Sequence, residues 1–290
     1  MRVLITGAGG MLGEAVYNEL KDFHEVYATS SRVTEEWITP LDVSSADAVE
    51  ECFRRIMPHV VIHLAALTDL EYCHIHPDQA YDVNFIGVMN VAREAKIHDA
   101  VLIHISTGSV FDGKKKCYRE DDIPNPLNVY AKSKLAGELA ARSIDRHIII
   151  RAGWMMGGGP EKDKTFTNKI IQKIRAGAKE LFIVNDTVGT ITHTPHLAAI
   201  INHLSLSNMY GIHHVGCIDS CSRVEIAEAI LWYYDLERKI LITQVPSDYF
   251  KRDYFVVRPA SEIITTTSEI YRPYWRICLE EYLHKYEWGI

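Results

Sequence analysis

The sequence predicts an α/β fold built on a doubly wound parallel sheet. Three observations support it: an apolar run at residues 3–6 opens the chain, a glycine-rich turn follows it directly, and strand-like runs then alternate with helical periodicity as far as residue 150. Alternation of this kind places helices on both faces of a parallel sheet. We therefore expect a Rossmann-type sheet with a smaller C-terminal lobe that binds the substrate.

The elements of the first half follow one another regularly. Short apolar, β-branched runs predict buried strands at residues 3–6, 25–29, 60–64, 101–105 and 147–150, with a further short strand at 38–41. Helical periodicity covers residues 11–20, 46–57 and 79–96, and another helix carries Tyr130. Ligands bind at the carboxyl ends of the strands in such a sheet, which is where we expect the site.

The turn after the first strand has a spacing typical of a phosphate-binding loop. It reads Gly7-x-x-Gly10-x-x-Gly13 rather than Gly-x-Gly-x-x-Gly, and it lies between a strand and a helix. That context lets the backbone approach a pyrophosphate resting on the helix N-terminus. The turn predicts a dinucleotide site that includes Met11 and Leu12 as well as the three glycines.

Tyr130 and Lys134 are expected to form an acid–base pair. Four residues apart on a helix, they share one face, so the ammonium group can approach the phenol and stabilise its ionised form. A free phenol has a pKa of ~10, and each unit of downward shift corresponds to ~1.4 kcal/mol. We expect Lys134 to lower the pKa of Tyr130 enough for acid–base work near neutral pH.

The second half is less regular. The run Gly-Gly-Gly-Pro at residues 157–160 interrupts the pattern, and a basic stretch at 162–179 contains a helix. Further elements are expected as a strand at 181–184, a helix after Thr194-Pro195, a strand at 211–215, and helices over 222–234 and 268–285. We predict a dinucleotide-binding domain over residues 1–153, to which elements at about 190–216 return, and a substrate-binding lobe mainly over 154–290.

Composition excludes some classes of partner. The net charge is −7, from 31 basic and 38 acidic residues, which leaves no basic surface for nucleic acid or anionic membranes. No apolar run approaches the ~18 residues of a membrane span, and the chain starts directly in a strand. The six cysteines lack paired Cys-x-x-Cys spacing, as expected of reduced thiols. We expect a cytoplasmic protein.

A series of motifs runs along nearly the whole chain. It comprises the glycine turn, Asp42-Val43, Leu64-Ala65-Ala66, Val83-Asn84 with Gly87, Ser106-Thr107, Val110-Phe111-Asp112-Gly113, Tyr130 and Lys134 with Gly137-Glu138, Arg151 to Trp154, and Arg258-Pro259-Ala260-Ser261. Together they resemble an extended short-chain dehydrogenase/reductase, most similar to the dTDP-4-dehydrorhamnose reductase family. The Val110–Gly113 motif and the Arg258–Ser261 motif indicate the reductase branch.

The resemblance implies a role for several of these residues. Thr107 would hydrogen-bond the substrate carbonyl, Tyr130 would donate the proton, and Lys134 would bind the nicotinamide ribose. Hydride transfer to a ketone leaves alkoxide charge, which two hydroxyl groups and a nearby cation stabilise. The same resemblance places Asp42, Val43, Leu64, Ala65 and Ala66 at the cofactor, and Thr107, Trp154 and Arg258 at a nucleotide-sugar substrate.

The end of the second strand favours NADPH over NADH, although NADH stays open. A carboxylate at this place accepts the ribose 2′-hydroxyl of NADH and repels a 2′-phosphate. Here the strand ends in Ser30-Ser31-Arg32, with no carboxylate before Glu35. Arginine can make paired charge-assisted bonds to a phosphate, so we expect Ser31 and Arg32 to contact it.

The residues after Thr107 depart from the family pattern. Gly108 and Ser109 occupy the places where the reductases usually carry an acidic and an aromatic residue, and where the related dehydratases carry consecutive Asp and Glu. This departure leaves the sugar open and disfavours a dehydratase.

No metal site is expected from the sequence. His193 and His196 flank a helix start, where capping is expected, and Cys217 and Cys221 have no ligand at metal spacing nearby. The interfacial magnesium site of some family members has no matching carboxylates here.

The sequence therefore predicts an NAD(P)H-dependent reductase of a nucleotide-linked 4-keto-6-deoxy sugar, with Tyr130 as proton donor. Two alternatives stay open. One is a sugar-nucleotide epimerase or dehydratase. The other is an NADP-binding regulatory subunit, because the β subunit of methionine adenosyltransferase resembles the same family and serves a partner enzyme. A homodimer is also open.

Overall fold

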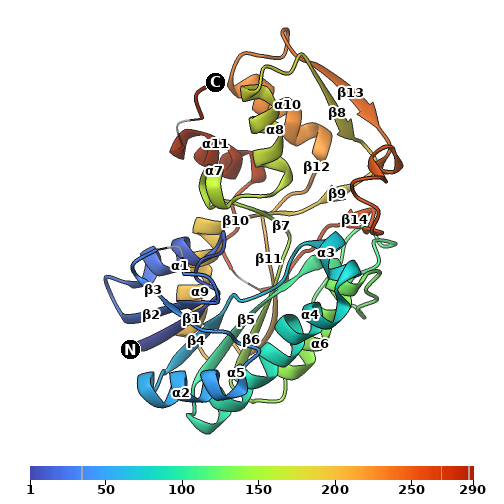
Figure 1. Cartoon of the computed structure of the whole chain (residues 1–290). Coiled ribbons are helices and arrows are strands. Elements are labelled where there is room, and N and C mark those ends of the chain that lie inside the picture. Colours follow the sequence, from blue (N-terminus) through green and yellow to red (C-terminus); the bar gives the residue numbers. More distant parts are fainter. Residues whose placement is uncertain (34, 269, 287) are drawn as a thin grey trace.

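A seven-stranded parallel sheet forms the centre of the molecule (Figure 1). The computed structural model describes residues 1–33, 35–268, 270–286 and 288–290. The sheet has the order β11-β6-β5-β4-β1-β2-β3, and every neighbouring pair is parallel. Its strands are β1 (Arg2–Thr6), β2 (Glu25–Ser30), β3 (Ile38–Pro40), β4 (Val60–His63), β5 (Val101–Thr107), β6 (His147–Ala152) and β11 (Gly211–Val215). This arrangement confirms the predicted Rossmann-type fold.

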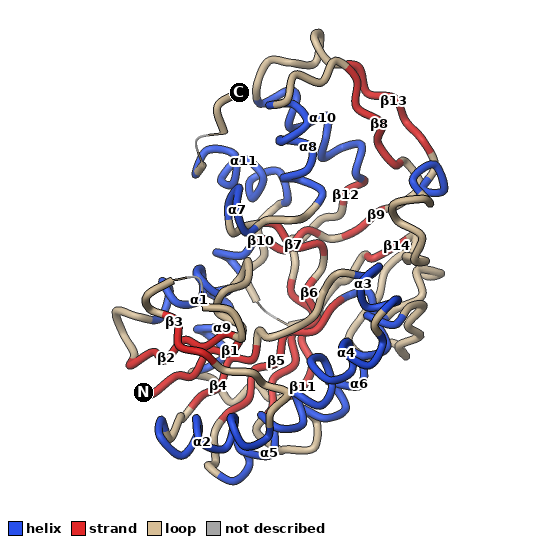
Figure 2. Tube along the Cα trace, in the orientation of Figure 1, coloured by secondary structure: helices blue, strands red, loops and turns tan. Residues whose placement is uncertain are grey.

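Helices cover both faces of the sheet, because alternate residues of each strand point to opposite sides. Val3 and Ile5 of β1 belong to a core shared with α1 (Gly13–Leu20) and α9 (Thr194–Ser205). Leu4, between them, belongs to a core shared with α2 (Ala46–Ile56), α5 (Gly87–Ile97) and α6 (Val129–Ala141). Figure 2 shows the strands as one layer with helices on either side.

The order of strands reverses between β1 and β4, since the chain builds the sheet first toward β3 and then toward β6. At such a switch point the loops after the strands diverge and leave a crevice in which ligands bind. The glycine turn follows β1 and residues 64–66 follow β4, so both border this crevice.

Most of the remaining elements gather in a lobe at one end of the sheet, whereas α3 (Leu70–Ile75) packs beside α6 and α4 (Pro77–Tyr81) (Figures 1 and 2). The lobe contains α7 (Gly159–Lys162), α8 (Phe166–Arg175), α10 (Arg223–Tyr233), α11 (Trp275–Lys285) and the parallel pair β8 (Glu180–Val184) and β13 (Leu241–Val245). Short strands lie between lobe and sheet: β7 (Trp154–Met156), β9 (Val188–Gly189), β10 (Ile191–His193), β12 (Cys221–Ser222) and β14 (Ser261–Glu262). The division of the chain into two domains at residue 153 stays a prediction.

Two helices differ from the sequence-based expectation. Residues 79–96 do not form one regular helix: α4 (Pro77–Tyr81) is followed by a π-helical turn, Asp82–Ile86, before α5 begins. The final helix starts at Trp275 rather than at 268, because Pro273 disfavours helical geometry in the residue before it. Asp219 Oδ1 accepts the Trp275 backbone N–H at 2.9 Å and fixes this start. Residue 269 of that expected helix lies outside the described part.

The described residues contain no helix with the length and apolar character needed to cross a membrane.

Candidate active site and cofactor crevice

The glycine turn is shaped for an anion. A Cβ at Gly7 would lie 2.4 Å from the Ala65 backbone nitrogen and one at Gly13 would lie 2.0 Å from the Ala8 carbonyl oxygen, so both positions need glycine for close packing. A Cβ at Gly10 would meet only the Gly7 carbonyl, at 3.3 Å, so this side of the turn is open. No side chain caps the N-terminus of α1, which leaves its first N–H groups for a phosphate.

The other expected cofactor residues surround the same crevice. Ser31 and Arg32 are exposed directly after β2, and Leu64, Ala65 and Ala66 are partly exposed directly after β4. Asp42 lies after β3, where its carboxylate accepts hydrogen bonds from the backbone and hydroxyl of Ser44. Val43 is buried and packs against Gly87 of α5, so it supports the crevice from below.

Lys162 of the lobe also reaches this crevice, although its sequence context favoured a solvated helix face over contact with a nucleotide diphosphate. Its Nζ lies 3.1 Å from a carboxylate oxygen of Glu14 and 3.1 Å from one of Glu35. Burial disfavours the ammonium charge, but the two carboxylates outweigh it and raise the pKa of Lys162. Glu35, the first carboxylate after β2, is therefore neutralised by a cation from across the crevice.

Thr107 and Tyr130 meet beside the crevice. Thr107 ends β5, and Tyr130 lies in the first turn of α6, whose start is fixed by Asn128 Oδ1 accepting the Ala131 N–H at 2.9 Å. Burial raises the pKa of Tyr130 to about 12, whereas a hydrogen bond with the Thr107 side chain acts in the opposite direction. The phenol is therefore protonated at neutral pH, which is the state that can donate a proton.

The expected effect of Lys134 on Tyr130 is not present in this structure. Lys134 Nζ instead donates a 2.6 Å hydrogen bond to the carbonyl of Ile105, which lies two residues before Thr107 on β5. Burial lowers the pKa of Lys134 to about 8, with Glu138 opposing the shift. The expectation that Lys134 lowers the tyrosine pKa is wrong here, because burial dominates both groups.

Two buried histidines lie behind Lys134. His63 of β4 and His104 of β5 stack with ring centroids 5.5 Å apart, and His63 Nδ1 is 2.8 Å from the Thr6 hydroxyl. Burial, and secondarily the Lys134 charge, lowers the pKa of His63 to about 3 and that of His104 well below its usual value. Both are neutral at physiological pH, so Lys134 is the cation of this group.

Asn84 holds the π-helical turn against α6. Its side-chain amide accepts from the Leu67 N–H at 2.8 Å and donates to the Leu67 carbonyl at 2.9 Å and the Ser133 hydroxyl at 3.0 Å. The loop after β4 and α6 are thereby tied together. A π-helical turn is common at functional sites, because it redirects side chains within a helix.

Glu262 brings a carboxylate to the site that sequence reasoning missed. The Trp154 Nε1–H donates to Glu262 Oε1 at 2.9 Å, and the Ser109 hydroxyl donates to the other carboxylate oxygen. Its negative charge is among the influences that raise the pKa of Tyr130. The residue lies on a two-residue strand far along the chain, so only its neighbour Ser261, within the Arg-Pro motif, could have indicated it.

Arginine side chains of the lobe face the same region. The Arg223 guanidinium lies 4.5 Å from the Trp154 ring centroid and 4.9 Å from that of Phe166. The expected substrate residue Arg258 donates to Glu71 Oε2 at 2.8 Å, and its charge contributes to lowering the pKa of Arg223, after the larger effect of burial. Trp154 and the two arginines thus form one group on the lobe side of Tyr130.

The fold and these side chains define a dinucleotide-fold protein with a Tyr-x-x-x-Lys pair and a facing threonine. The chain belongs to the family described as RmlD substrate binding domain, whose model matches residues 1–287. It is 33% identical over 98% of its length to the spore coat polysaccharide biosynthesis protein SpsK of Bacillus subtilis, of which it covers 97%.

Two further relatives bear on function. The chain is 31% identical to the bovine methionine adenosyltransferase 2 subunit beta, with 81% of this chain and 72% of that protein covered. The crystal structure of dTDP-4-dehydrorhamnose reductase from Bacillus anthracis in complex with NADP superposes with a TM-score of 0.89 at 30% identity, over 98% of this chain and 99% of that one.

Proposed function

We propose that this chain is an NADPH-dependent reductase of a nucleotide-linked 4-keto-6-deoxy sugar, similar to dTDP-4-dehydrorhamnose reductase. The observation that carries the proposal is that Thr107, at the end of β5, is close enough to Tyr130 to act on the pKa of its phenol, beside a glycine turn shaped for a pyrophosphate. Membership of the RmlD family and the similarity to a reductase with bound NADP support it.

In this mechanism Thr107 and Tyr130 both donate hydrogen bonds to the substrate carbonyl oxygen. The cofactor supplies the hydride. Negative charge then develops on the oxygen, where the two hydroxyls stabilise it. Lys134 would bind the nicotinamide ribose. Tyr130 completes the reaction by transferring its phenolic proton to that oxygen. Its high pKa fits this direction, because an alkoxide is a far stronger base than a phenolate.

The cofactor residues follow from the geometry of the crevice. Gly7, Gly10, Met11, Leu12 and Gly13 would hold the pyrophosphate, and Ser31 and Arg32 would hold the adenosine ribose and its 2′-phosphate. The base and nicotinamide would lie along Asp42, Val43, Leu64, Ala65 and Ala66. The neutralisation of Glu35 by Lys162 supports NADPH, because an unpaired carboxylate there would repel a 2′-phosphate.

The substrate would lie between Tyr130 and the lobe. Trp154 offers an aromatic surface there, while Arg223 and Arg258 offer positive charge suited to a diphosphate. Glu262 and Ser109 are placed to bond sugar hydroxyls. A cytoplasmic location and a homodimer stay predictions, as does the domain boundary at residue 153.

A regulatory role is the second candidate, because of the similarity to the methionine adenosyltransferase β subunit. That candidate requires cofactor binding without turnover. The presence of Thr107, Tyr130 and Lys134 in one group favours catalysis over it.

The decisive experiment is an assay of NADPH consumption with dTDP-4-dehydrorhamnose, for the parent protein and Tyr130→Phe. The variant keeps the ring and loses only the proton donor, so it should bind NADPH and lose ~10²–10⁴-fold in turnover. Tyr210→Phe, whose hydroxyl contacts Arg146 at the other end of the sheet, is the matched control and should keep full activity. NADPH binding by the parent without turnover of this or related keto sugars would favour the regulatory role instead.

A further inference from the structure

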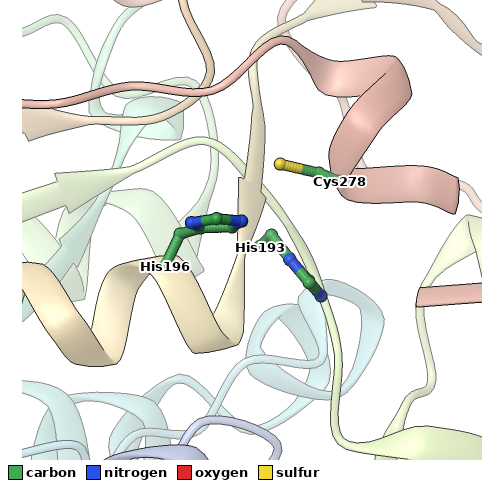
Figure 3. Close-up of side chains that lie close together, drawn as sticks. All are labelled: His193, His196 and Cys278. Atoms are coloured by element: carbon green, nitrogen blue, oxygen red, sulfur yellow. The ribbon is translucent and has the colours of Figure 1, made fainter. Parts of the chain in front are cut away.

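A cluster of metal-ligating side chains lies where the lobe meets the sheet (Figure 3). His193 ends β10, His196 is in the first turn of α9, and Cys278 is on α11. One nitrogen of each histidine and the Cys278 sulfur all lie within 4.8 Å of one another. The cluster is separate from the Tyr130 site, to which none of these residues contributes.

The interior of this cluster is buried but incompletely hydrogen-bonded. His193 is 4% exposed and Cys278 is fully buried, yet His193 Nδ1 has no hydrogen-bond partner within the described ranges. A buried polar atom without a partner is costly, and a native structure usually satisfies it with a protein group, a water or an ion. The neighbouring Glu281 Oε2, 3.4 Å from this atom, does not complete a hydrogen bond with it.

Glu281 supplies a fourth donor on the solvent side. Its Oε2 lies 2.8 Å from His196 Nε2 and 3.4 Å from His193 Nδ1. The donors form two pairs with a spacing of three residues, His193/His196 and Cys278/Glu281. Cys278 and Glu281 share a face of α11, whereas His193 lies directly before α9 and His196 in its first turn. Glu281 and His196 are partly exposed, so an ion can reach the cluster from solvent.

We propose that His193, His196, Cys278 and Glu281 bind one zinc ion. Zinc prefers imidazole, thiolate and carboxylate ligands in tetrahedral geometry, and this set contains all three. Bond lengths of ~2.0–2.3 Å place tetrahedral ligand atoms ~3.3–3.8 Å apart. The donor atoms of His193, His196 and Cys278 already lie within 4.8 Å of one another, and Glu281, whose carboxylate now contacts His196, would turn toward the ion.

Cys217 would contact the ligating Cys278 sulfur without binding the zinc ion itself. Its sulfur is 3.5 Å from that of Cys278, too far for a disulfide and suited to an S–H donor on the ligating thiolate. Its backbone N–H bonds the Ile191 carbonyl at 2.7 Å, so the loop after β11 is held against β10 as well.

The ion would fasten the C-terminal helix to the dinucleotide fold. α11 belongs to the core of the lobe, whereas α9 shares the sheet core with α1, the helix that follows the glycine turn. A zinc ion between them would fix the lobe relative to the crevice. The site is structural, because all four of its positions are filled by protein. It goes beyond the proposed reductase function, and its test does not depend on turnover.

The test measures metal directly in the full-length protein. Purified chain is stripped with a chelator, titrated with zinc alone, and assayed for bound metal by mass spectrometry and for Tm. We expect one zinc per chain and a Tm that rises with zinc. Cobalt in place of zinc should show the charge-transfer band of a cobalt–thiolate bond, which is absent in Cys278→Ser.

Matched variants separate the cluster from general effects on folding. Cys278→Ser, His196→Gln and Glu281→Gln should each weaken zinc binding by more than ~100-fold, since even outer-shell partners contribute 10–100-fold. Cys221→Ser, another buried thiol of the lobe, and His203→Gln, an exposed histidine of α9, should bind zinc like the parent. Three results would overturn the proposal. The first is less than half an equivalent of bound zinc in the parent, and the second is a zinc affinity of Cys278→Ser equal to that of the parent. The third is that Cys217→Ser loses zinc binding while Glu281→Gln keeps it.

Discussion

Trp154 donates a 2.9 Å hydrogen bond from its indole Nε1 to Glu262 Oε1, and this bond joins strand β7 to strand β14. The other oxygen of Glu262 accepts from Ser109, two residues after Thr107. A carboxylate thus lies between the aromatic surface of the lobe and Tyr130, whose pKa it helps to raise after the larger effect of burial.

Replacing this carboxylate should shift the pH profile of the reaction. In Glu262→Gln the negative charge is lost while the side-chain shape is kept, so the pKa of Tyr130 should fall. Reduction requires protonated Tyr130, and the loss of activity at high pH should therefore begin at a lower pH than in the parent. The measurement is kcat/KM between pH 8 and 12, a range that reaches the pKa of about 12 of Tyr130. Glu237→Gln, at an exposed position, is the control and should behave like the parent. If the basic limb of Glu262→Gln is not shifted either, Glu262 does not act on the Tyr130 phenol.

The glycine turn and the Tyr130/Lys134 pair were predictable because each is a local pattern with a physical requirement. Gly7 and Gly13 occupy places where any Cβ would overlap backbone atoms, and such requirements can be recognised in a sequence. The parallel sheet followed from the regular alternation of strands and helices. The fold class could therefore be predicted before the structure was known.

Glu262, Lys162 and the histidine–cysteine cluster could not be predicted in the same way. Each depends on contacts between segments distant in the chain: Glu262 with Ser109, Lys162 with Glu14, Cys278 with His196. The environment of Lys134 was mispredicted for a related reason. Spacing along a helix shows which residues share a face, but not that burial and the Ile105 carbonyl determine their protonation.

The chain should not act as a 4,6-dehydratase. Elimination of water needs a proton acid and a base beside the sugar, and the residues after Thr107 are Gly108 and Ser109 rather than two carboxylic acids. Glu262 is the carboxylate at this place, and both of its oxygens already accept hydrogen bonds. Incubation with NAD⁺ and dTDP-glucose should give no 4-keto-6-deoxy product by mass spectrometry. Formation of that product, and its loss in Glu262→Gln, would contradict the reasoning and make Glu262 the base.

Acid should destabilise the fold through His63. Its pKa is about 3 in the folded chain and ~6.5 when unfolded, so both states are neutral above ~6.5 and only the unfolded state binds a proton below it. The contribution of His63 to the free energy of unfolding should therefore be fully present above pH ~6.5. Below that pH the free energy of unfolding should fall by ~1.4 kcal/mol per pH unit as the pH drops toward 3. Between pH 6.5 and 5, urea unfolding should show a loss about 1.6 kcal/mol smaller in His63→Asn than in the parent. Equal losses in both proteins would rule out His63 as the group, and the exposed-site variant His203→Asn should match the parent.

Arg32 and Lys162 should set the cofactor preference in two different ways. Arg32 is exposed at the end of β2, where its guanidinium can bond a 2′-phosphate, so Arg32→Ala should raise the KM for NADPH by ~10-fold or more and leave NADH nearly unchanged. Lys162 acts through Glu35, from which it is 3.1 Å distant. Lys162→Met leaves that carboxylate without its cation, so NADPH should again weaken while NADH keeps or gains affinity.

The neighbouring residue Lys164 is exposed and forms no ion pair with the described residues, so Lys164→Met is the control and should leave both cofactors unchanged. The double variant Lys162→Met with Glu35→Gln tests the cause, because removal of the carboxylate should restore NADPH binding toward that of the parent. Steady-state kcat/KM for both cofactors, with binding measured by calorimetry, gives the comparison. If Arg32→Ala weakens both cofactors equally, Arg32 does not contact the 2′-phosphate. If the double variant stays as weak as Lys162→Met alone, Lys162 contacts the cofactor directly rather than through Glu35.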